Sequence, residues 1–477
     1  MHRKPVIAIV PLGHYVYFEQ FEGLYDELNK KSVEFSQYFD DTVEIIITEY
    51  VDTVEKAFKT VQALKIKDVD GIFLLLTTYL PSAVAAPFAN YLDVPQILVG
   101  IQPLDHLDYG NCTTFMQLVN DDVCAMPEIA GAYLRLGKKI PPCIVAASSQ
   151  RDAIEKEVQK WQRAISAKAA FKYAIFGYLG HTYEGMYDMH TDPTAFSGVF
   201  KSHVKMLEMC ELAMYVDMIS NEQLNEKIEL IQNTFSIQDP SIDPLTDYVH
   251  RSDLEWSARI ACALDMLVER NGLRALAYYY KGENNNLYER IAAGMIIGNT
   301  LLTSSGTPLA GEADLKTAAT MLIINRMGGG GSFAEIHPFD VIDNCVLIGH
   351  DGPHNIEISE GKPILRKLKK YHGKAGSGIG VEFSLKAGPV TLLSMNCLSN
   401  GQFKLVAATG TSVFGAIPQT GNTNTRVSFN MPITEFLKQW CEAGPTHHLA
   451  LGTGNLIPEI QAFARIMNLN LEVIAFN

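Results

Sequence analysis

The chain has 477 residues, of which 47% are hydrophobic and 19% charged, with a formal net charge of -14. At roughly 100–200 residues per domain, this length predicts two to four domains. The acidic balance argues against a nucleic-acid-binding or polybasic membrane-surface protein and favours a small, uncharged substrate.

Eight cysteines are spread thinly along the chain, and none forms a Cys-x-x-Cys pair. This spacing differs from a disulfide framework or a zinc ribbon, so it predicts reduced thiols in a cytoplasmic protein. The N-terminus, Met1 to Pro5, lacks a signal-peptide pattern. The apolar stretch from Gly71 to Pro87 is broken by polar residues, so it predicts a buried strand and a helix rather than a membrane span.

The first part of the chain alternates short apolar runs with amphipathic segments. The runs predict strands buried on both faces at Val6–Val10, Val43–Ile47, Ile72–Leu76, Ile97–Val99 and Ile144–Ala146. Apolar residues at helical spacing from Val54 to Leu64 predict a helix between the second and third strands. We therefore expect a flavodoxin-like or Rossmann-like α/β domain over residues 1–168. No Gly-x-Gly-x-x-Gly follows the first strand, so no dinucleotide site is predicted.

The same alternation restarts and predicts a second α/β domain over residues 169–325. Its predicted elements are strands at Phe171–Phe176, Leu212–Val216 and Leu273–Tyr280 and a helix at Leu254–Arg270. The acidic, proline-containing stretch Asp239–Asp247 is typical of a surface connection.

Residues 326–477 predict a C-terminal β-barrel domain, because their apolar segments become short and turn-separated. The predicted strands are Cys345–Ile348, Gly380–Leu385, Val390–Met395 and Phe403–Val406. Asn400-Gly401 is a strong hairpin signal between the last two strands. Helices are expected at Ile433–Cys441 and Leu456–Met467.

Four residues in glycine-rich or turn-rich contexts carry potential metal chemistry: Glu312, Glu335, His350 and His448. Two carboxylates and two imidazoles form an O/N ligand set suited to a borderline divalent ion such as Mn²⁺. Each residue also has an ordinary explanation. Glu312 suits the first turn of a helix, His350 suits a turn after a strand, and the pair His447-His448 suits a polar loop.

In their order and surroundings these residues resemble the L-arabinose isomerase and L-fucose isomerase family, in its arabinose isomerase branch. The first glutamate lies in Ala310-Gly-Glu312-Ala-Asp-Leu-Lys-Thr-Ala318, and the second follows Gly330-Gly-Ser-Phe-Ala. His350 follows a Leu-x-Gly turn, and His448 is the second histidine of a pair. Without a one-residue gap Asp351 would replace His350 as the third ligand, and His354 is a weaker candidate.

Other motifs of the family are altered in this chain. The Gly-Asp-Trp that follows the first glutamate is replaced by Ala313-Asp-Leu, and the N-terminal Gly-Ser-Gln-His-Leu-Tyr turn by Pro11-Leu-Gly-His-Tyr15. The Asn-Gln-Thr-Ala-His loop is replaced by Val119-Asn-Asp-Asp-Val-Cys124, which lacks the histidine. The resemblance therefore implies a retained metal apparatus and a substrate other than L-arabinose.

The resemblance implies a metal-dependent aldose–ketose isomerase that works through an enediolate. Glu312 and Glu335 would be both catalytic residues and ligands, with His350 and His448 completing a site for Mn²⁺, Co²⁺ or Mg²⁺. Contacts with a monosaccharide are implied for His14, Tyr15, Met186, Tyr280 and His447. The family forms trimers and hexamers in which an N-terminal domain closes a neighbour's site, so a homo-oligomer is expected.

Three alternatives remain open at this point. One is a sugar epimerase that uses the same metal site, and another is a catalytically silent sugar-binding or regulatory protein on the same scaffold. The third is a phosphosugar enzyme. It would need cations such as those of Arg366–Lys370, or the glycine run Gly328–Gly331 as a phosphate nest.

Overall fold

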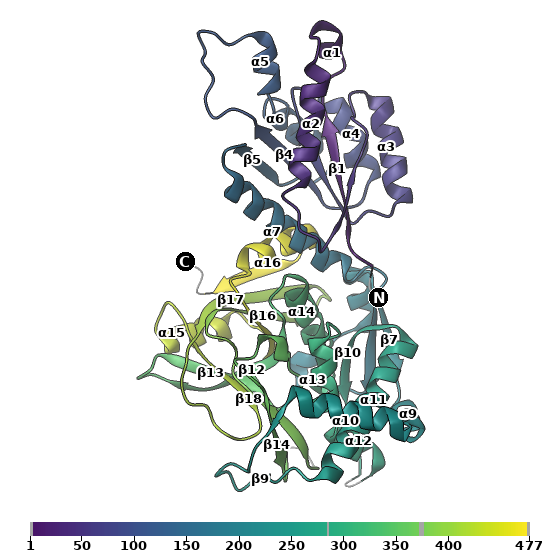
Figure 1. The fold of residues 1–477 in the computed structure, drawn as a ribbon, viewed down its shortest axis with the longest axis vertical. Coiled ribbons are helices and arrows are strands. Elements are labelled where there is room, and N and C mark those ends of the chain that lie inside the picture. Colours follow the sequence, from purple (N-terminus) through teal and green to yellow (C-terminus); the bar gives the residue numbers. More distant parts are fainter. Residues whose placement is uncertain (1–2, 284–285, 372–375, 475–477) are drawn as a thin grey trace. The chain divides into compact units, whose positions relative to one another are not determined.

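The computed structural model describes residues 3–283, 286–371 and 376–474. The chain divides into two compact units, the first comprising its first 169 residues and the second beginning at Ala170 (Figure 1). The domain boundary predicted between residues 325 and 326 falls within the second unit and stays a prediction. Within the described ranges, no helix has both the length and the apolar character needed to cross a bilayer.

The first unit contains a five-stranded parallel sheet in the order β2-β1-β3-β4-β5. This order is that of flavodoxin-like doubly wound sheets. The strands are β1 (Val6–Leu12), β2 (Glu44–Ile47), β3 (Gly71–Leu76), β4 (Gln96–Gln102) and β5 (Cys143–Ala147). The helices are α1 (Val16–Gln20), α2 (Leu24–Ser36), α3 (Val54–Ile66), α4 (Ser82–Tyr91), α5 (Thr114–Val119), α6 (Met126–Arg135) and α7 (Arg151–Ala169).

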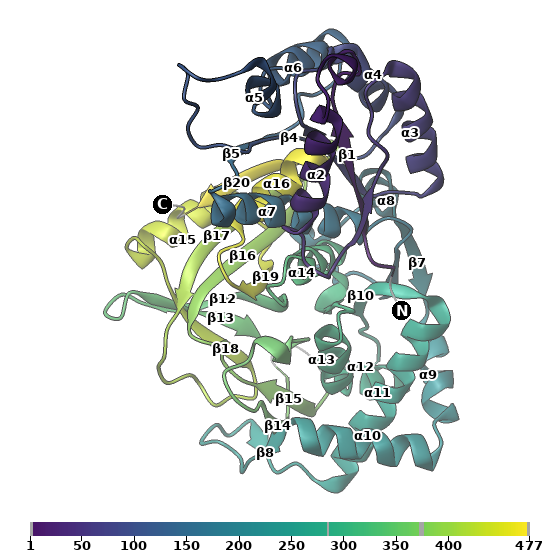
Figure 2. The same cartoon turned by 45° about the horizontal axis from the view of Figure 1, so that its top comes forward.

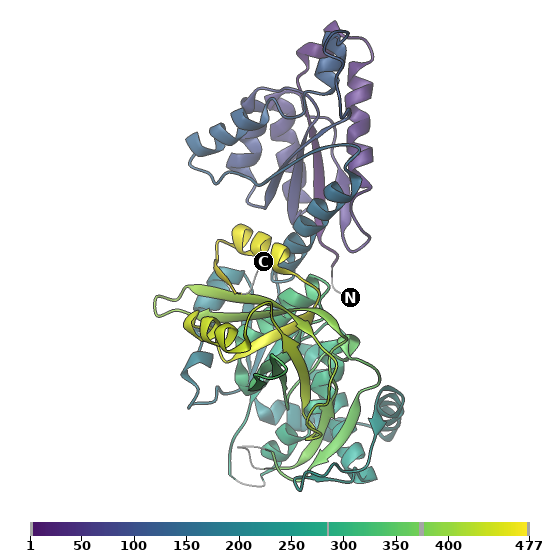
Figure 3. The same cartoon turned by 90° about the vertical axis from the view of Figure 1, so that its left-hand side faces the viewer.

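Helices cover both faces of this sheet. On one face, Val61 of α3, Phe88 of α4 and Ile129 of α6 belong to one buried cluster with the strands. On the other face, the Phe35 ring of α2 lies 5.7 Å from that of Phe73, and Figure 3 shows α2 running beside the strands. Because both faces are covered, β1 and β3 are buried along their whole length, as their continuous apolar runs predicted.

The second unit begins with a four-stranded parallel sheet in the order β11-β10-β6-β7. Its strands are β6 (Ile175–Gly180), β7 (His203–Leu207), β10 (Leu273–Tyr279) and β11 (Leu309–Ala310). Its helices are α8 (Pro193–Phe200), α9 (Met209–Met218), α10 (Asn221–Thr234), α11 (Arg251–Asn271), α12 (Leu287–Ala293), α13 (Ile296–Ser304) and α14 (Leu315–Arg326). The sheet and the helix α11 agree with the predicted second α/β region.

Two strand predictions in this region were wrong. Leu212–Val216 lies inside α9, where the buried residues follow helical spacing while Met214 and Met218 are half exposed. Of Phe171–Phe176, only the end belongs to β6. Phe171 stacks on Phe200 at 4.7 Å, so its apolar character serves core packing, and the positive φ of Tyr173 interrupts an extended chain.

The C-terminal part is a mixed sheet in the order β16-β19-β12-β13-β18-β17-β20, and β16 also pairs with β17. These pairings form a closed circuit of six antiparallel strands, to which β20 adds in parallel (Figure 2). The strands are β12 (Ser332–Asp340), β13 (Cys345–His350), β16 (Gly388–Cys397), β17 (Phe403–Ser412), β18 (Thr423–Ser428), β19 (His448–Thr453) and β20 (Asn470–Ile474). The predicted hairpin is confirmed, with Gly401 at a φ of 77° in its turn.

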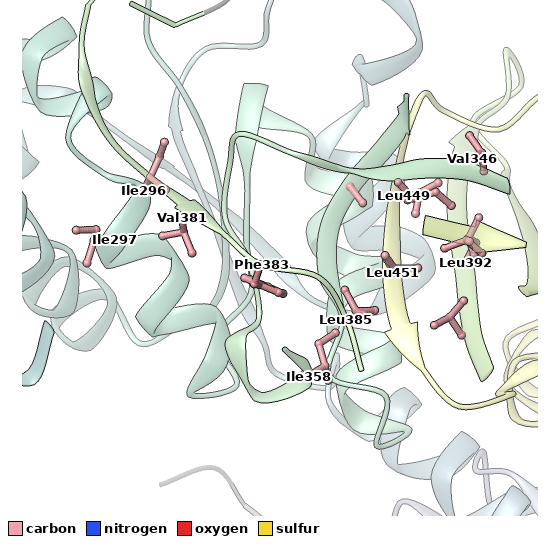
Figure 4. Close-up of a cluster of buried hydrophobic side chains, with 14 of the residues drawn as sticks. Ile296, Ile297, Val346, Ile358, Val381, Phe383, Leu385, Leu392, Leu449 and Leu451 are labelled. Atoms are coloured by element: carbon pink, nitrogen blue, oxygen red, sulfur yellow. The ribbon is translucent and has the colours of Figure 1, made fainter. Parts of the chain in front are cut away.

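Smaller elements complete the unit: β8 (Ser236–Ile237), β9 (Thr246–Asp247), β14 (Ile364–Leu368), β15 (Gly378–Glu382), α15 (Ile433–Glu442) and α16 (Ile457–Met467). The apolar core of the mixed sheet includes Val346, Leu392, Leu449 and Leu451 (Figure 4). The structure thus confirms an α/β protein with two parallel sheets and a C-terminal mixed sheet.

The helix α14 lies between the parallel sheet and the mixed sheet of the second unit. It contacts β10 and β11 of the parallel sheet and β16 and β19 of the mixed sheet. Every residue from Leu315 to Ile324 is buried, as expected for a helix covered on all sides. Its N-terminal end therefore has a fixed position relative to the strands around it.

A buried ion pair stabilises the loops at the carboxyl edge of the first sheet. Lys31 Nζ of α2 donates to Asp122 Oδ1 at 2.6 Å and to the carbonyl oxygens of Thr77 and Val119. Burial raises the pKa of Asp122 to about 7, although Lys31 opposes this shift. Removing one partner would leave the other charge buried without compensation.

We predict that Lys31→Met lowers the free energy of unfolding by roughly 3–5 kcal/mol, measured by equilibrium urea denaturation. Lys30→Met is the matched control, because Lys30 is exposed and pairs only with a neighbouring glutamate on its own helix. The control should change stability by no more than about 0.5 kcal/mol. Equal stabilities of the two variants would contradict the assigned role of Lys31.

Candidate functional site

Glu312 lies in a strained turn between β11 and α14. Both Glu312 and Ala313 have positive φ, 56° and 58° respectively. This left-handed conformation costs a non-glycine residue about 1–2 kcal/mol, and such strain concentrates at functional sites. The turn holds the Glu312 carboxylate in a buried position, with Oε2 3.3 Å from His448 Nε2.

The strand ladder of the mixed sheet positions the other carboxylate. Glu335 on β12 is paired directly with His448 on β19 and, on its other side, with Gly349 on β13. Side chains of directly opposed residues start about 4.5–5.5 Å apart. His350, the last residue of β13, places Nε2 3.9 Å from Glu335 Oε1. Backbone pairing therefore brings three of the predicted ligands together.

The structure contains two groups of potential ligands that share His448. One is Glu312, His447 and His448, and the other is Glu335, His350 and His448; within each group the ligand atoms lie within 4.8 Å of one another. All four predicted ligands thus meet in one place. The alternatives for the third ligand lie outside both groups. Asp351 contacts His350, and His354 is fully buried with Nδ1 3.4 Å from Ser332 Oγ.

A carboxylate orients the imidazole of His448, because His448 Nδ1 is hydrogen-bonded to Asp314 Oδ2 at 3.2 Å. His350 Nδ1 lies 3.0 Å from Asp351 Oδ1, but this contact lacks hydrogen-bond geometry. A carboxylate at Nδ1 favours the tautomer that carries its proton there, which leaves the Nε2 lone pair for a metal. His448 Nε2 is buried and has no hydrogen-bond partner of suitable geometry. The donor set therefore fits a divalent ion.

His447 follows the same pattern. Its Nδ1 lies 2.7 Å from Asp188 Oδ2, and the same oxygen accepts the His447 backbone N–H at 2.9 Å. Burial alone would raise the pKa of Asp188, but these bonds from His447 lower it to about 2. His447 Nε2 is also buried without a hydrogen-bond partner. His447, the first histidine of the pair, is thus oriented by a carboxylate at Nδ1, as His448 is.

Asp314 is the N-cap of α14 and connects that helix to the ligands. Burial would raise its pKa, but Lys316 and hydrogen bonds from His448 and Thr317 hold the pKa below its usual value. The side chain of Asp314 accepts from the backbone N–H groups of Lys316 and Thr317. The pKa of His448 is raised, because Asp314 and Glu312 outweigh the opposing effect of burial.

An open pocket leads to this cluster from the carboxyl edge of the central parallel sheet. It has about 740 Å³ of empty space, a figure that includes open solvent at its mouth. Glu312 and His350 line its inner end. Its other lining residues include Tyr278, Tyr279, Tyr280, Lys281, Glu289, Asp351 and Tyr371. The pocket lies at the carboxyl ends of β10 and β11, the edge of a parallel sheet at which ligands usually bind.

The remaining predicted contact residues have different positions. Tyr280 lines the pocket, whereas Met186 is half-buried before a short turn and is not among the lining residues. His14 and Tyr15 belong to the first unit, after β1, with ring centroids 5.4 Å apart. Burial lowers the pKa of His14 against the effect of Asp52. A substrate contact by either residue of the first unit stays a prediction.

Residues 330–470 match the family of the L-arabinose isomerase C-terminal domain. The chain is also similar to the L-arabinose isomerase of Yersinia enterocolitica, with 22% identity over 348 residues, 69% of this chain and 66% of that enzyme. The sulfoquinovose isomerase of Alkalicoccus urumqiensis is 21% identical over 320 residues, which cover 66% of this chain and 68% of that enzyme.

The chain is a distant member of the L-arabinose isomerase family. Its aligned part spans slightly less than two thirds of the length of the Yersinia enzyme. The matched domain contains Glu335, His350 and His448, while Glu312 precedes it. The family relationship is therefore consistent with the position of these four side chains close together in the structure. It does not identify the substrate.

We predict that Ala313→Gly stabilises the protein by about 0.5–1 kcal/mol, because glycine adopts a positive φ without strain. Urea denaturation would measure this change. Ala318→Gly is the control, since Ala318 lies inside α14 and glycine there should cost about 1 kcal/mol or more. A loss of stability in both variants would contradict the strained turn.

We also predict that affinity for Mn²⁺ rises with pH in the metal-free protein. The raised pKa values of His447 and His448 mean that these imidazoles keep their protons above pH 6.5, and each must become neutral to bind a metal. Affinity should rise about tenfold per pH unit for each displaced proton, then level off above the folded pKa. Calorimetric titrations that show constant affinity between about pH 5.5 and 8 would contradict this prediction.

Proposed function

We propose that the protein is a Mn²⁺-dependent aldose–ketose isomerase whose substrate is a monosaccharide other than L-arabinose. The observation that carries this proposal is the position of two carboxylates, Glu312 and Glu335, around the buried Nε2 of His448, with Glu312 Oε2 at 3.3 Å. A pocket opens onto Glu312. The distant relationship to two sugar isomerases supports the same reaction class.

Glu312, Glu335, His350 and His448 would hold the ion. When bound, a divalent ion supplies positive charge next to the oxygens of C1 and C2, where negative charge develops in an enediolate. Co²⁺ or Mg²⁺ would provide the same charge, but the two imidazoles favour a borderline ion over Mg²⁺.

The two glutamates would move the proton between C1 and C2 of the open-chain sugar. One carboxylate removes the proton from C2 of the aldose, and a proton returns to C1. The hydroxyl proton of O2 passes to O1, so the aldose becomes the ketose without a net change in atoms or electrons. Glu312 and Glu335 arise from different sheets of the second unit, so they can act from two sides of the substrate. The strained turn and the strand ladder fix their positions.

Asp314 would keep the imidazole of His448 in the required orientation, because its hydrogen bond to Nδ1 directs Nε2 toward Glu312. His350 Nε2 lies 3.9 Å from Glu335 Oε1. Phe333, fully buried, places its ring 4.4 Å from that of His448 and 4.6 Å from that of His350. This apolar wall restricts water and rotation on one side of the ligands.

The pocket supports an uncharged sugar over a phosphosugar. Its cation Lys281 is outnumbered by Glu289, Glu312 and Asp351. Two cations of the basic stretch considered for phosphate are engaged elsewhere, since Arg366 donates to Glu382 at 2.9 Å and Lys367 pairs with Asp253.

The glycine run also gives little support to a phosphate nest. The amides of Gly328, Gly329 and Gly331 already donate to backbone carbonyl oxygens. An amide that is already paired is not free to bind phosphate.

We extend the proposal to the fold, assembly and location of the protein. The closed circuit of six strands supports a β-barrel for the C-terminal domain.

A homo-oligomer, trimer or hexamer, is proposed from the family relationship, and sedimentation velocity would test it. All eight cysteines are free of disulfides, which supports a reducing location such as the cytoplasm.

The first experiment is an isomerisation screen of metal-stripped protein with and without Mn²⁺, over pentoses, hexoses, deoxy sugars and acidic sugars. We expect Mn²⁺-dependent conversion of at least one neutral sugar. Glu312→Gln and Glu335→Gln should each lower turnover by at least about 10²-fold, because each removes a carboxylate that transfers the proton. Chromatographic detection of aldose and ketose would measure both effects.

Glu442→Gln is the matched control, since Glu442 is exposed at the end of α15. It should retain wild-type turnover. Near wild-type turnover in the Glu312 and Glu335 variants would refute their assigned roles. Inversion at one carbon without ketose formation would identify an epimerase, and a folded protein without Mn²⁺ affinity or conversion would identify a silent sugar-binding protein.

A further inference from the structure

Two arginines lie at the edge of the central parallel sheet that is opposite the metal cluster. Arg274 is the second residue of β10, and Arg326 is the last residue of α14. Since α14 follows β11 and returns antiparallel to it, its end reaches the edge where β10 begins. Burial and the nearby charge of Arg326 together lower the pKa of Arg274 to about 9. The two guanidinium groups therefore lie close to each other.

Neither arginine has a partner for its charge among the described residues. Arg274 is only 8% exposed, and its Nε and Nη1 are buried without hydrogen bonds, as is Arg326 Nε. A buried unpaired charge is strongly unfavourable. Arg366, which is buried in the same unit, differs from Arg274 because it forms an ion pair with Glu382. The two guanidinium groups thus need an anion, and the described part of the folded chain does not provide one.

The backbone at Arg274 is also irregular. Leu273 pairs with Ile175 and Ala275 pairs with the next residue, Phe176, so Arg274 is an extra residue in the β10 strand. Such bulges redirect a side chain and are over-represented near functional sites. The dipole of α14 favours a cation at its end and so accounts for Arg326 alone. It offers no reason for a buried arginine on the neighbouring strand.

We propose that Arg274 and Arg326 form a binding site for a small oxyanion of the phosphate class. Guanidinium groups bind phosphate oxygens through paired N–H donors, and two of them would neutralise a doubly charged anion. Arg326 is half-buried, which leaves a route from solvent.

This anion site is separate from the sugar pocket. Arg274 is five residues before Tyr279 of the pocket on the same strand, a separation of about 16 Å. The inference therefore does not depend on the isomerase activity.

The test is a calorimetric titration of the metal-stripped full chain with inorganic phosphate, repeated with sulfate. We expect saturable binding of both anions, at least tenfold weaker in Arg326→Gln and in Arg274→Gln. Arg326→Lys keeps the charge but loses the paired donors, so it should bind with intermediate affinity and remain folded. Arg251→Gln is the control, because Arg251 has an 86% exposed side chain on α11.

Binding that is lost in both arginine variants and retained in the Arg251 control would establish the site. Absence of saturable binding by the wild-type protein, or equal affinity in all variants, would overturn it. If Arg274→Gln does not fold, Arg326→Gln and Arg326→Lys carry the test alone. None of these titrations measures turnover of a sugar substrate. The test of the anion site would therefore stand even if the isomerase proposal failed.

Discussion

The buried carboxylate of Asp314 is the interaction on which the candidate site most depends. It caps α14, accepts from the Thr317 hydroxyl, and contacts His448 Nδ1 from the mixed sheet. One side chain thus fixes the start of the helix between the sheets and the orientation of a ligand. Because Lys316 is also fully buried and compensates its charge at 3.5 Å, the carboxylate stays ionised in an apolar interior. The turn that carries Glu312 immediately precedes this cap.

Much of the fold was predictable because strands buried on both faces read as continuous apolar runs. The runs at Ile72–Leu76 and Ile97–Val99 both lie within observed strands. The same reasoning failed at Leu212–Val216, since five apolar residues fit either a strand or one turn of a buried helix. The length of the whole element decides between strand and helix, and α9 has ten residues.

The four candidate ligands that lie together could be selected from sequence because each lies in a distinctive local motif, whereas the residues that support them could not. Asp188 reaches His447 across 259 positions of the chain, and Tyr371 lines the pocket from a segment without any recognisable pattern. Asp314 is the exception. An aspartate two residues before Lys316-Thr317 is a common helix N-cap, and that local signal would have indicated its position.

The direct pairing of Glu335 with His448 limits how this protein can diverge. Adding or deleting one residue in β12 or β19 would turn one of these side chains to the opposite face of the sheet. Substitutions around the pocket leave the ladder intact, so they can accumulate freely. Within this lineage, insertions and deletions should therefore be excluded from the two strands and tolerated in the turns that join them to the rest of the sheet.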